Sequence, residues 1–176
     1  MRVIAGKYKG LRLTFKITDV CRPTKDRVKE SLFSMLADAC LDAVCLDLFA
    51  GTGSLGFEAL SRGAGFVDFI DVDCSVLKKN AMIFPADIPI AIHKMKAEKF
   101  LIQASKKYDL IFIDPPWKRP QEFQNALKLI TEFDILKPNG FIILEQEKIQ
   151  VECEHLNVFK ERKFGNTIIK ILKKTI

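Results

Sequence analysis

The chain has 176 residues, of which 48% are hydrophobic and 28% are charged. This balance is typical of one compact domain and excludes a disordered, collagen-like or coiled-coil protein. No window approaches the roughly 18 consecutive apolar residues of a membrane-spanning helix, and residues 1–7 lack the apolar core of a signal peptide. We therefore expect a cytoplasmic protein.

The net charge of +6 is concentrated at the two ends of the sequence. Residues 1–30 carry nine basic and three acidic side chains, and residues 157–176 carry six and one, whereas residues 31–156 carry thirteen basic and eighteen acidic side chains. Clustered positive charge attracts a phosphate backbone, although a basic face also serves solubility. Charge alone leaves nucleic-acid binding open.

Five cysteines are scattered along the chain without a Cys-x-x-Cys pair. An odd and scattered set predicts neither a disulfide framework nor a zinc site. We interpret these cysteines as small buried hydrophobic residues and expect no metal.

The first elements form a basic extension. Residues 2–4 and 11–15 have β character and are separated by a segment that begins and ends with glycine, which predicts a basic hairpin. A connector ends at Pro23, and Thr24 is a candidate N-cap for a helix that follows. We therefore divide the chain into an N-terminal hairpin and connector, residues 1–23, and a main domain, residues 24–176.

From residue 44 onward, short apolar runs alternate with amphipathic segments. The pattern predicts strands at 44–49, 66–70, 90–92, 110–113 and 141–144, helices at 54–62, 75–84, 99–105 and 121–133, and a turn at Pro138-Asn139-Gly140. Such alternation predicts an α/β fold with a doubly wound parallel sheet, covered by helices on both faces. Residues 156–164 and 167–172 flank Gly165-Asn166, a hairpin signal, so the sheet should finish with an antiparallel pair.

Gly51, Gly53 and Gly56 form a Gly-x-Gly-x-x-Gly pattern between the first of these strands and the next helix. Glycines there let the backbone turn tightly and approach a ligand, while the helix N-terminus offers free N–H groups. Asp71 ends the next strand, twenty residues after Gly51, where a carboxylate would meet the hydroxyls of a ribose. A dinucleotide and S-adenosylmethionine both present a ribose, so this pattern leaves both open.

Asp47 favours S-adenosylmethionine. A carboxylate within an apolar strand is costly to bury unless it is paired. Placed just before the glycine turn, it would attract the ammonium and sulfonium groups of S-adenosylmethionine and repel the pyrophosphate of a dinucleotide. In the alternative interpretation Asp47 only caps the backbone of the loop.

The segment Asp114-Pro115-Pro116-Trp117 follows a buried strand, at the edge where open α/β sheets bind ligands. Consecutive prolines fix the backbone so that the Asp114 carboxylate and the Pro115 carbonyl point to one spot. Two such acceptors suit the two hydrogens of an exocyclic amine, and Trp117 offers a flat face for the base that carries this amine. The alternative is a rigid turn with a tryptophan in the core.

With these motifs the sequence resembles the Asp/Asn-Pro-Pro-aromatic class of amino-methyltransferases. It resembles more closely the bacterial family that methylates N2 of a guanine in 16S ribosomal RNA. Residues 22–33 are similar to that family's R-P-T-x-D-R-V-R/K-E-S-L-F segment, and residues 2–10, 47–56, 58–64, 114–117 and 161–167 follow in the family's order.

The resemblance implies a seven-stranded, Rossmann-like methyltransferase fold that uses S-adenosylmethionine. It implies that 16S ribosomal RNA is the substrate, which we expect within a small-subunit particle. The expected cofactor-binding residues are Asp47, Phe49, Gly51, Thr52, Gly53, Gly56, Asp71 and Ala97. The expected catalytic residues are Asp114, Pro115, Pro116 and Trp117, and the expected RNA-binding residues are Arg2, Lys7, Lys9, Arg12, Arg22 and Arg27.

Three positions depart from the family's pattern. Lys96 stands where the family usually has an acid that would meet the adenine amino group, so we expect the backbone at Ala97 and apolar contacts to hold adenine. Trp117 replaces the commoner Tyr or Phe, and Asn166 replaces a more usual Asp.

Other functions stay open at this point. Methylation of adenine N6 in RNA or DNA would use the same exocyclic amine chemistry. An NAD-dependent oxidoreductase would share the glycine turn and Asp71, but the chain lacks a substrate domain, and His93 and His155 lie outside every motif. The intact segment at residues 114–117 argues against a non-catalytic RNA-binding module. We expect a monomer, because no exposed apolar stripe is left over.

Overall fold

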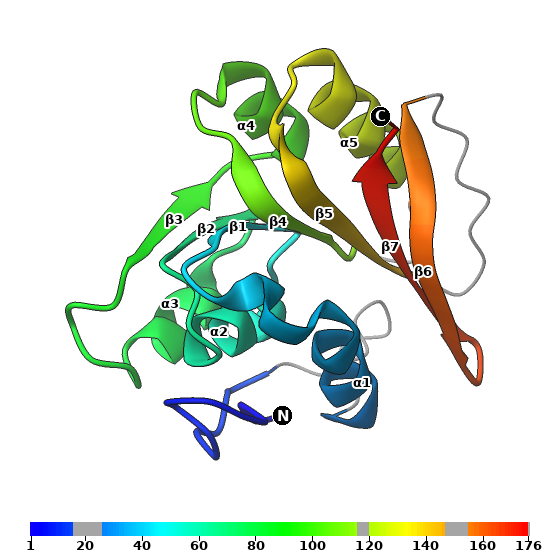
Figure 1. Cartoon of the computed structure of the whole chain (residues 1–176). Coiled ribbons are helices and arrows are strands. Elements are labelled where there is room, and N and C mark those ends of the chain that lie inside the picture. Colours follow the sequence, from blue (N-terminus) through cyan, green and yellow to red (C-terminus); the bar gives the residue numbers. More distant parts are fainter. Residues whose placement is uncertain (16–25, 116–119, 147–154, 176) are drawn as a thin grey trace.

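The computed structural model describes residues 1–15, 26–115, 120–146 and 155–175. Seven strands form one sheet in the order β3-β2-β1-β4-β5-β7-β6 (Figure 1). The strands are β1 (Val44–Leu48), β2 (Phe66–Asp71), β3 (Ile90–Lys94), β4 (Tyr108–Ile113), β5 (Leu136–Gln146), β6 (Leu156–Phe164) and β7 (Thr167–Lys174). The first five are parallel, and β7 is antiparallel to both β5 and β6. The predicted parallel sheet with an antiparallel end is confirmed.

Helices cover both faces of this sheet (Figure 1). On one face lie α1 (Asp26–Leu36), the short 3-10 helix η1 (Ala37–Cys40), α2 (Ser54–Ser61) and α3 (Ser75–Ala81). On the other face lie α4 (Ala97–Gln103) and α5 (Pro120–Glu132). The central strands are apolar on both sides because alternate residues point to opposite helix layers. In β4, for example, Phe112 packs with the α1 and α2 layer and Ile113 with the α4 and α5 layer.

The predicted turn at Pro138-Asn139-Gly140 is wrong, because β5 runs through it. Between two pairs of the β4–β5 ladder, Tyr108 with Leu136 and Leu110 with Phe141, β5 has four residues where β4 has one. The strand absorbs the extra residues as an irregularity in register, which suits a proline that cannot donate to the ladder. Helix α4 also begins two residues earlier than predicted, at Ala97.

Residues 1–15 lie against the body of the molecule and are paired with one another. Arg2 and Arg12 form an antiparallel bridge, and the Val3 N–H donates to the Leu11 carbonyl at 2.9 Å. Val3 and Leu13 are buried in the same hydrophobic core as α1 and α2. None of the helices in the described ranges is long and apolar enough to cross a bilayer.

Candidate active site

The strand order reverses between β1 and β4, and this point organises the site. In open α/β sheets, ligands bind outside the carboxyl ends of the strands where the order reverses. The glycine turn follows β1, Asp71 ends β2 and Asp114 follows β4. Because these strands are parallel neighbours, the topology brings all three features to one edge of the sheet.

Asp71 is bound to the glycine turn. Its Oδ2 accepts the backbone N–H of Gly51 at 2.7 Å, and its Oδ1 accepts the N–H of Asp73 at 2.9 Å. The spacing of twenty residues between Gly51 and Asp71 thus corresponds to a direct contact. A carboxylate has about four lone-pair sites, so each oxygen keeps capacity for a further hydroxyl donor.

Asp47 lies on β1 and is 2% exposed. Its Oδ2 accepts the backbone N–H of Gly56 at 2.9 Å, which is the capping contact that the alternative interpretation of Asp47 expected. Burial nevertheless raises the pKa of Asp47 to about 7, because this hydrogen bond only partly offsets desolvation and the nearby Asp71 charge raises the pKa further. A cationic group placed beside Asp47 would lower this electrostatic cost.

Two glycines of the turn have steric reasons to be glycine. Gly53 has a φ of +79°, which side chains other than glycine rarely adopt. A Cβ on Gly56 would come within 2.3 Å of the Phe69 ring. The close packing brings the first turn of α2 onto β2 and places the Gly56 N–H against Asp47.

Phe49, the first residue after β1, has a φ of +61°. A bulky residue in the left-handed region is a backbone outlier, and such outliers cluster at ligand sites. Phe49 is half-buried and packs at the margin of the core on the α4 and α5 side. It belongs to the predicted cofactor set, together with the half-buried Gly51 and Thr52.

Asp114 and Pro115 follow directly after β4. The pKa of the Asp114 carboxyl is raised well above its usual range, first by desolvation and then by the negative charges of Glu145 and Asp47. Asp114 at the end of β4 thus lies within electrostatic range of one acid on each neighbouring strand, Asp47 on β1 and Glu145 on β5. Asp47 is therefore close enough to both Asp71 and Asp114 for their charges to interact with it.

Glu145 is an acid of this edge that the sequence analysis missed. It is 6% exposed and lies on β5, one position beyond the Ile113–Leu144 pair of the β4–β5 ladder. Its register therefore matches that of Asp114. The available signal was an acid at the end of the apolar run at residues 141–144, the same kind of signal that singled out Asp47.

Other predicted residues lie as follows. Ala97 is buried at the start of α4, and Lys96 before it is exposed. Pro116, Trp117 and Arg22 lie outside the described residues. His93 is engaged elsewhere, with its Nε2 at 2.8 Å from the Asp68 carboxylate. In the part of the chain that the structure describes, no group of three or more His, Cys, Asp or Glu side chains is placed to hold a metal ion.

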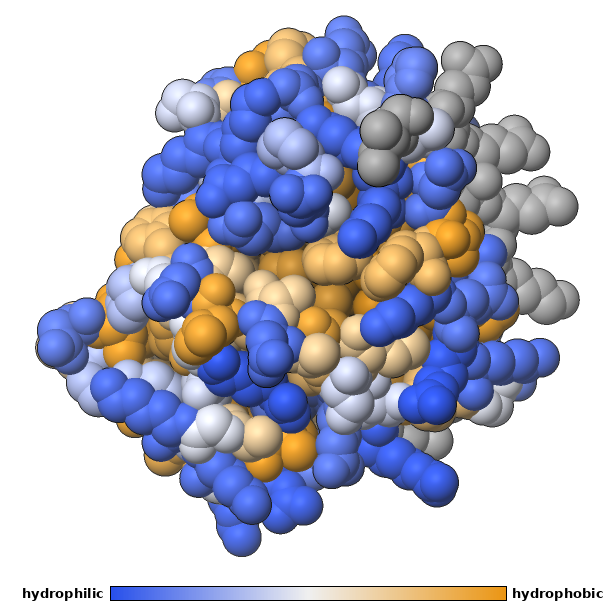
Figure 2. Space-filling view, viewed as in Figure 1, coloured by the Kyte–Doolittle hydropathy of each residue, from blue (hydrophilic) through white to orange (hydrophobic). Residues whose placement is uncertain are grey.

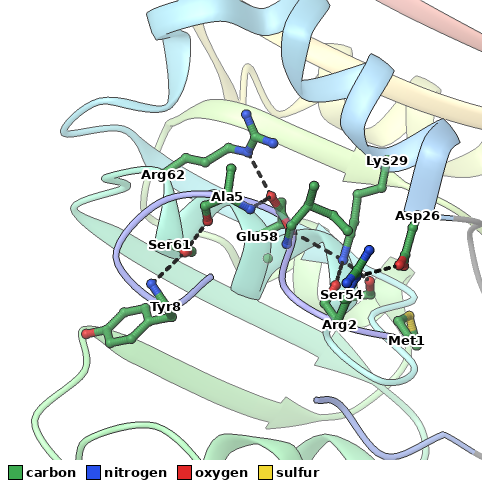
Figure 3. A network of polar contacts seen from close by, with 12 residues as sticks. Met1, Arg2, Ala5, Tyr8, Asp26, Lys29, Ser54, Glu58, Ser61 and Arg62 are labelled. Atoms are coloured by element: carbon green, nitrogen blue, oxygen red, sulfur yellow. Dashed lines mark hydrogen bonds and ion pairs between the residues drawn. The ribbon is translucent and has the colours of Figure 1, made fainter. Parts of the chain in front are cut away.

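The basic N-terminal segment is anchored beside the glycine turn by Glu58 of α2, which is fully buried (Figure 3). Its carboxylate accepts the N–H groups of Ile4 at 2.7 Å and Ala5 at 3.1 Å. It also pairs with Lys29 at 3.3 Å and with Arg62 at 2.8 Å. Four donors from three parts of the chain thus converge on one acid.

Lys29 of α1 extends this network to the glycine turn (Figure 3). Its Nζ donates to the Arg2 carbonyl at 2.7 Å and to the Ser54 hydroxyl at 3.1 Å. Ser54 is the first residue of α2. Burial lowers the pKa of Lys29, while the Glu58 charge opposes this shift.

Asn80 of α3 makes a second connection between the same two segments. Its Nδ2 lies 2.9 Å from the Thr14 carbonyl and 2.9 Å from the Thr52 carbonyl, and its Oδ1 accepts the Thr14 N–H at 2.8 Å. Asn80 is 1% exposed, so these contacts are shielded from water.

The basic side chains predicted to bind RNA are exposed around this anchor. Those within the described residues are Arg2, Lys7, Lys9, Arg12 and Arg27. Arg2 also pairs with Asp26 at the start of α1, with its Nε 2.9 Å from the carboxylate. The first four lie on the segment that Glu58 and Asn80 hold next to the glycine turn.

A family model described as "Conserved hypothetical protein 95" matches residues 1–173. The chain belongs to this family. Ribosomal RNA small subunit methyltransferase D of Haemophilus influenzae is 39% identical over 173 residues, which cover 94% of this chain and 89% of that protein. The protein of the same name from Escherichia coli is 36% identical over 150 residues, covering 84% of this chain and 75% of that protein.

The solved structures support the family assignment. The structure of yhhF from Escherichia coli has a TM-score of 0.87 and 31% identity, and the match covers 99% of this chain and 97% of that chain. Membership of the family confirms the methyltransferase class and the resemblance drawn from residues 22–33 and 114–117. It decides against the NAD-dependent oxidoreductase.

Proposed function

We propose that this protein transfers a methyl group from S-adenosylmethionine to the exocyclic N2 amine of a guanine in 16S ribosomal RNA. The observation that carries the proposal is the half-buried Asp114, followed by the buried Pro115, at the edge of the sheet where the glycine turn and Asp71 lie. The names of the Haemophilus and Escherichia relatives support small-subunit ribosomal RNA as the substrate class.

The residues at this edge fit S-adenosylmethionine by the chemistry of their polar groups. Asp47 is a buried acid whose raised pKa a cationic group would lower, which suits the methionine end of the cofactor. Asp71 keeps lone pairs for the ribose hydroxyls, and the buried Ala97 at the start of α4 offers backbone and apolar contact to adenine. The full proposed set is Asp47, Phe49, Gly51, Thr52, Gly53, Gly56, Asp71 and Ala97. When bound, the cofactor supplies a methyl group activated by its sulfonium.

On the substrate side, the Asp114 carboxylate and the Pro115 carbonyl accept the two hydrogens of the guanine amine. Holding both hydrogens directs the nitrogen lone pair toward the methyl group, so most of the rate comes from positioning. The raised pKa of Asp114 suits it to hold the proton that the amine loses. Pro116 fixes the backbone of this segment, and Trp117 stacks on the base.

The basic N-terminal residues hold the RNA. Arg2, Lys7, Lys9, Arg12, Arg22 and Arg27 are proposed to contact phosphates as a group, because phosphate contacts position a nucleic acid while the pocket selects the base. The anchor through Glu58 and Asn80 fixes this basic segment relative to the glycine turn. We also propose that the protein acts as a cytoplasmic monomer, on a small-subunit particle.

The test is transfer of labelled methyl from S-adenosylmethionine to small ribosomal subunits that lack base methylation, followed by digestion and identification of the modified nucleoside. We expect N2-methylguanosine with the wild type and none with Asp114→Asn. The exposed acid Asp87, in the segment before β3, gives the matched control Asp87→Asn, which should methylate like the wild type. Label in N6-methyladenosine would contradict the guanine assignment, and binding of NAD in place of S-adenosylhomocysteine would contradict the cofactor.

A further inference from the structure

The strand β6 presents an exposed basic strip at the edge of the sheet. Residues 157–163 are all exposed, in contrast to the buried central strands. Lys160, Arg162 and Lys163 provide three positive charges there, and the single acid Glu161 is paired with Lys170 of β7 at 3.1 Å. The strip is therefore a positively charged surface, and it is separate from the basic N-terminal segment.

The end of the β6–β7 hairpin lies at the same edge of the sheet as Asp114. The carboxyl end of β5, at Gln146, pairs with Ile168 near the start of β7, and the turn pair Phe164–Thr167 lies beyond it. Because β5 is parallel to β4, this end of β5 is on the side where Asp114 follows β4. Hydrophilic side chains stand at the lower right of Figure 2, where Figure 1 places the end of this hairpin.

Two of the basic residues face helix α1. Lys160 and Arg162 lie opposite Ile171 and Ile169, whose side chains belong to the core beneath α1. Lys160 Nζ donates to the Met35 carbonyl at 2.8 Å, and Arg162 Nη1 donates to the Ser31 hydroxyl at 3.0 Å. These contacts use one donor of each side chain, and an ammonium has three donors and a guanidinium five.

The N-terminal patch reaches the same helix from its other end. Arg2 pairs with Asp26, the first residue of α1, and the next residue, Arg27, is exposed. Basic side chains therefore run from the N-terminal segment over the start of α1 to β6. The N-terminal segment and the α1-facing residues of β6 both lie on the face of the sheet that α1 and α2 cover, which is also the side of Asp47 and Glu58.

We propose that Lys160 and Arg162 form a second RNA-binding surface, which holds the phosphate backbone on the side of the active site opposite the N-terminal segment. This rests on the proposed RNA substrate. An enzyme that acts on a single base must extrude it from its stack, and two separated phosphate contacts hold the strand while the base between them turns out. The charge of the strip selects phosphate over a second, equally basic copy of this chain.

The test compares two double variants that each remove two positive charges. Lys160→Gln with Arg162→Gln changes the strip, and Lys99→Gln with Lys128→Gln changes exposed lysines of α4 and α5 on the opposite face. Binding to a full-length 16S ribosomal RNA transcript is measured as a function of salt. We expect the slope of log K against log salt to shrink by about 1 to 2 for the strip variant, because each lost phosphate contact removes about 0.7 to 0.9.

The control variant should keep the wild-type slope, and both variants should bind S-adenosylhomocysteine like the wild type, which shows that the fold is intact. Equal slopes for the two variants would overturn the proposal. Unchanged RNA binding together with concentration-dependent dimerisation of the strip variant would overturn it too, because the charges would then only guard a sheet edge against strand pairing. If the wild type binds 16S RNA but does not methylate it, the proposed function fails while the slopes still decide the role of β6.

Discussion

Glu58 in α2 and Asp47 in β1 are both buried acids on the side of the sheet covered by α1, α2 and α3, yet their surroundings differ in kind. Glu58 receives two backbone N–H groups and two cationic side chains, from Lys29 and Arg62. Asp47 receives the Gly56 N–H, and the charges that shift its pKa and that of Asp114 are those of other acids.

The difference separates two uses of a buried charge. A compensated acid holds elements together, and the Glu58 network joins the N-terminal segment, α1 and α2 into one unit. Acids at the carboxyl edge of a sheet whose pKa is raised by burial and by one another carry an electrostatic cost that a cationic ligand relieves, and such perturbed groups are typical of functional sites. The Glu58 network therefore stabilises the fold, and we propose that the acids around Asp47 serve ligand binding and chemistry.

The largest effect on stability should come from breaking the compensated group. Lys29→Met leaves Glu58 buried without one of its two cations, and removing one partner of a buried pair typically costs about 3–5 kcal/mol of unfolding free energy. Urea denaturation measures this loss. Lys107→Met is the control, since Lys107 pairs with Asp134 at the exposed surface and its loss should leave the unfolding free energy nearly unchanged. Similar losses in the two variants would remove the contrast between buried and exposed pairs.

The stability of the folded protein should depend on pH through Asp47. The pKa of Asp47 is about 7 in the folded protein, against an ordinary value of 3.8, so between these pH values the unfolded chain is ionised while the folded chain holds a proton. Stability therefore falls as pH rises through this window, by at most about 4 kcal/mol for this group. Asp47→Asn removes this contribution. In urea unfolding without ligand, the unfolding free energy of the variant relative to that of the wild type should therefore rise from pH 4 to pH 8. Parallel pH profiles would show that Asp47 is compensated after all.

The same titration should appear in ligand binding. If Asp47 faces the cationic end of S-adenosylmethionine, ionisation of this carboxyl favours the complex, and the affinity of the wild type rises with pH through about 7. Isothermal titration at pH 6 and pH 8 measures the change. The Asp47→Asn variant should bind more weakly at pH 8 and lose this rise, whereas a rise of the same size in the variant would place the responsible group elsewhere.

A smaller loss of stability is expected when the uncharged contact of the N-terminal segment, made by Asn80, is removed. Asn80→Ala removes three part-buried hydrogen bonds to the backbone of Thr14 and Thr52, which should cost about 1–3 kcal/mol of unfolding free energy. Amide hydrogen exchange of residues 11–15 should become faster, because the Asn80 contacts hold this end of the segment at Thr14. Asn125→Ala is the matched control, since Asn125 donates to Glu98 at the exposed surface. Unchanged exchange in Asn80→Ala would show that the contacts of Glu58 and Ser61 hold the segment without Asn80.

Local patterns predicted the sheet and the glycine turn because their signals are local. The alternation of apolar runs with helices predicted the parallel part of the sheet. The spacing of Gly51 and Asp71 corresponds to a hydrogen bond of 2.7 Å. The turn at Pro138-Asn139-Gly140 was wrong because its residues have turn propensity, while the ladder with β4 tolerates an irregularity at that point.

The charged contacts between distant segments were beyond prediction from the sequence. Lys29 lies on a helix rich in polar residues and is typical of a solvated face until Glu58, twenty-nine residues later, is placed against it. Asn80 has no sequence signal, since its value lies in reaching Thr14 and Thr52 at once. Such pairings depend on the assembled core rather than on any window of the chain.

The central claim is that Asp114 positions the amine that receives the methyl group, and single-turnover methyl transfer to small ribosomal subunits tests it most directly. With cofactor and RNA saturating, Asp114→Asn should slow the rate by about 10²- to 10⁴-fold, the range typical of a lost proton-handling group. Its affinity for S-adenosylmethionine should stay close to that of the wild type, and Asp87→Asn should show the wild-type rate. Wild-type turnover by Asp114→Asn, with both ligands bound, would contradict the account.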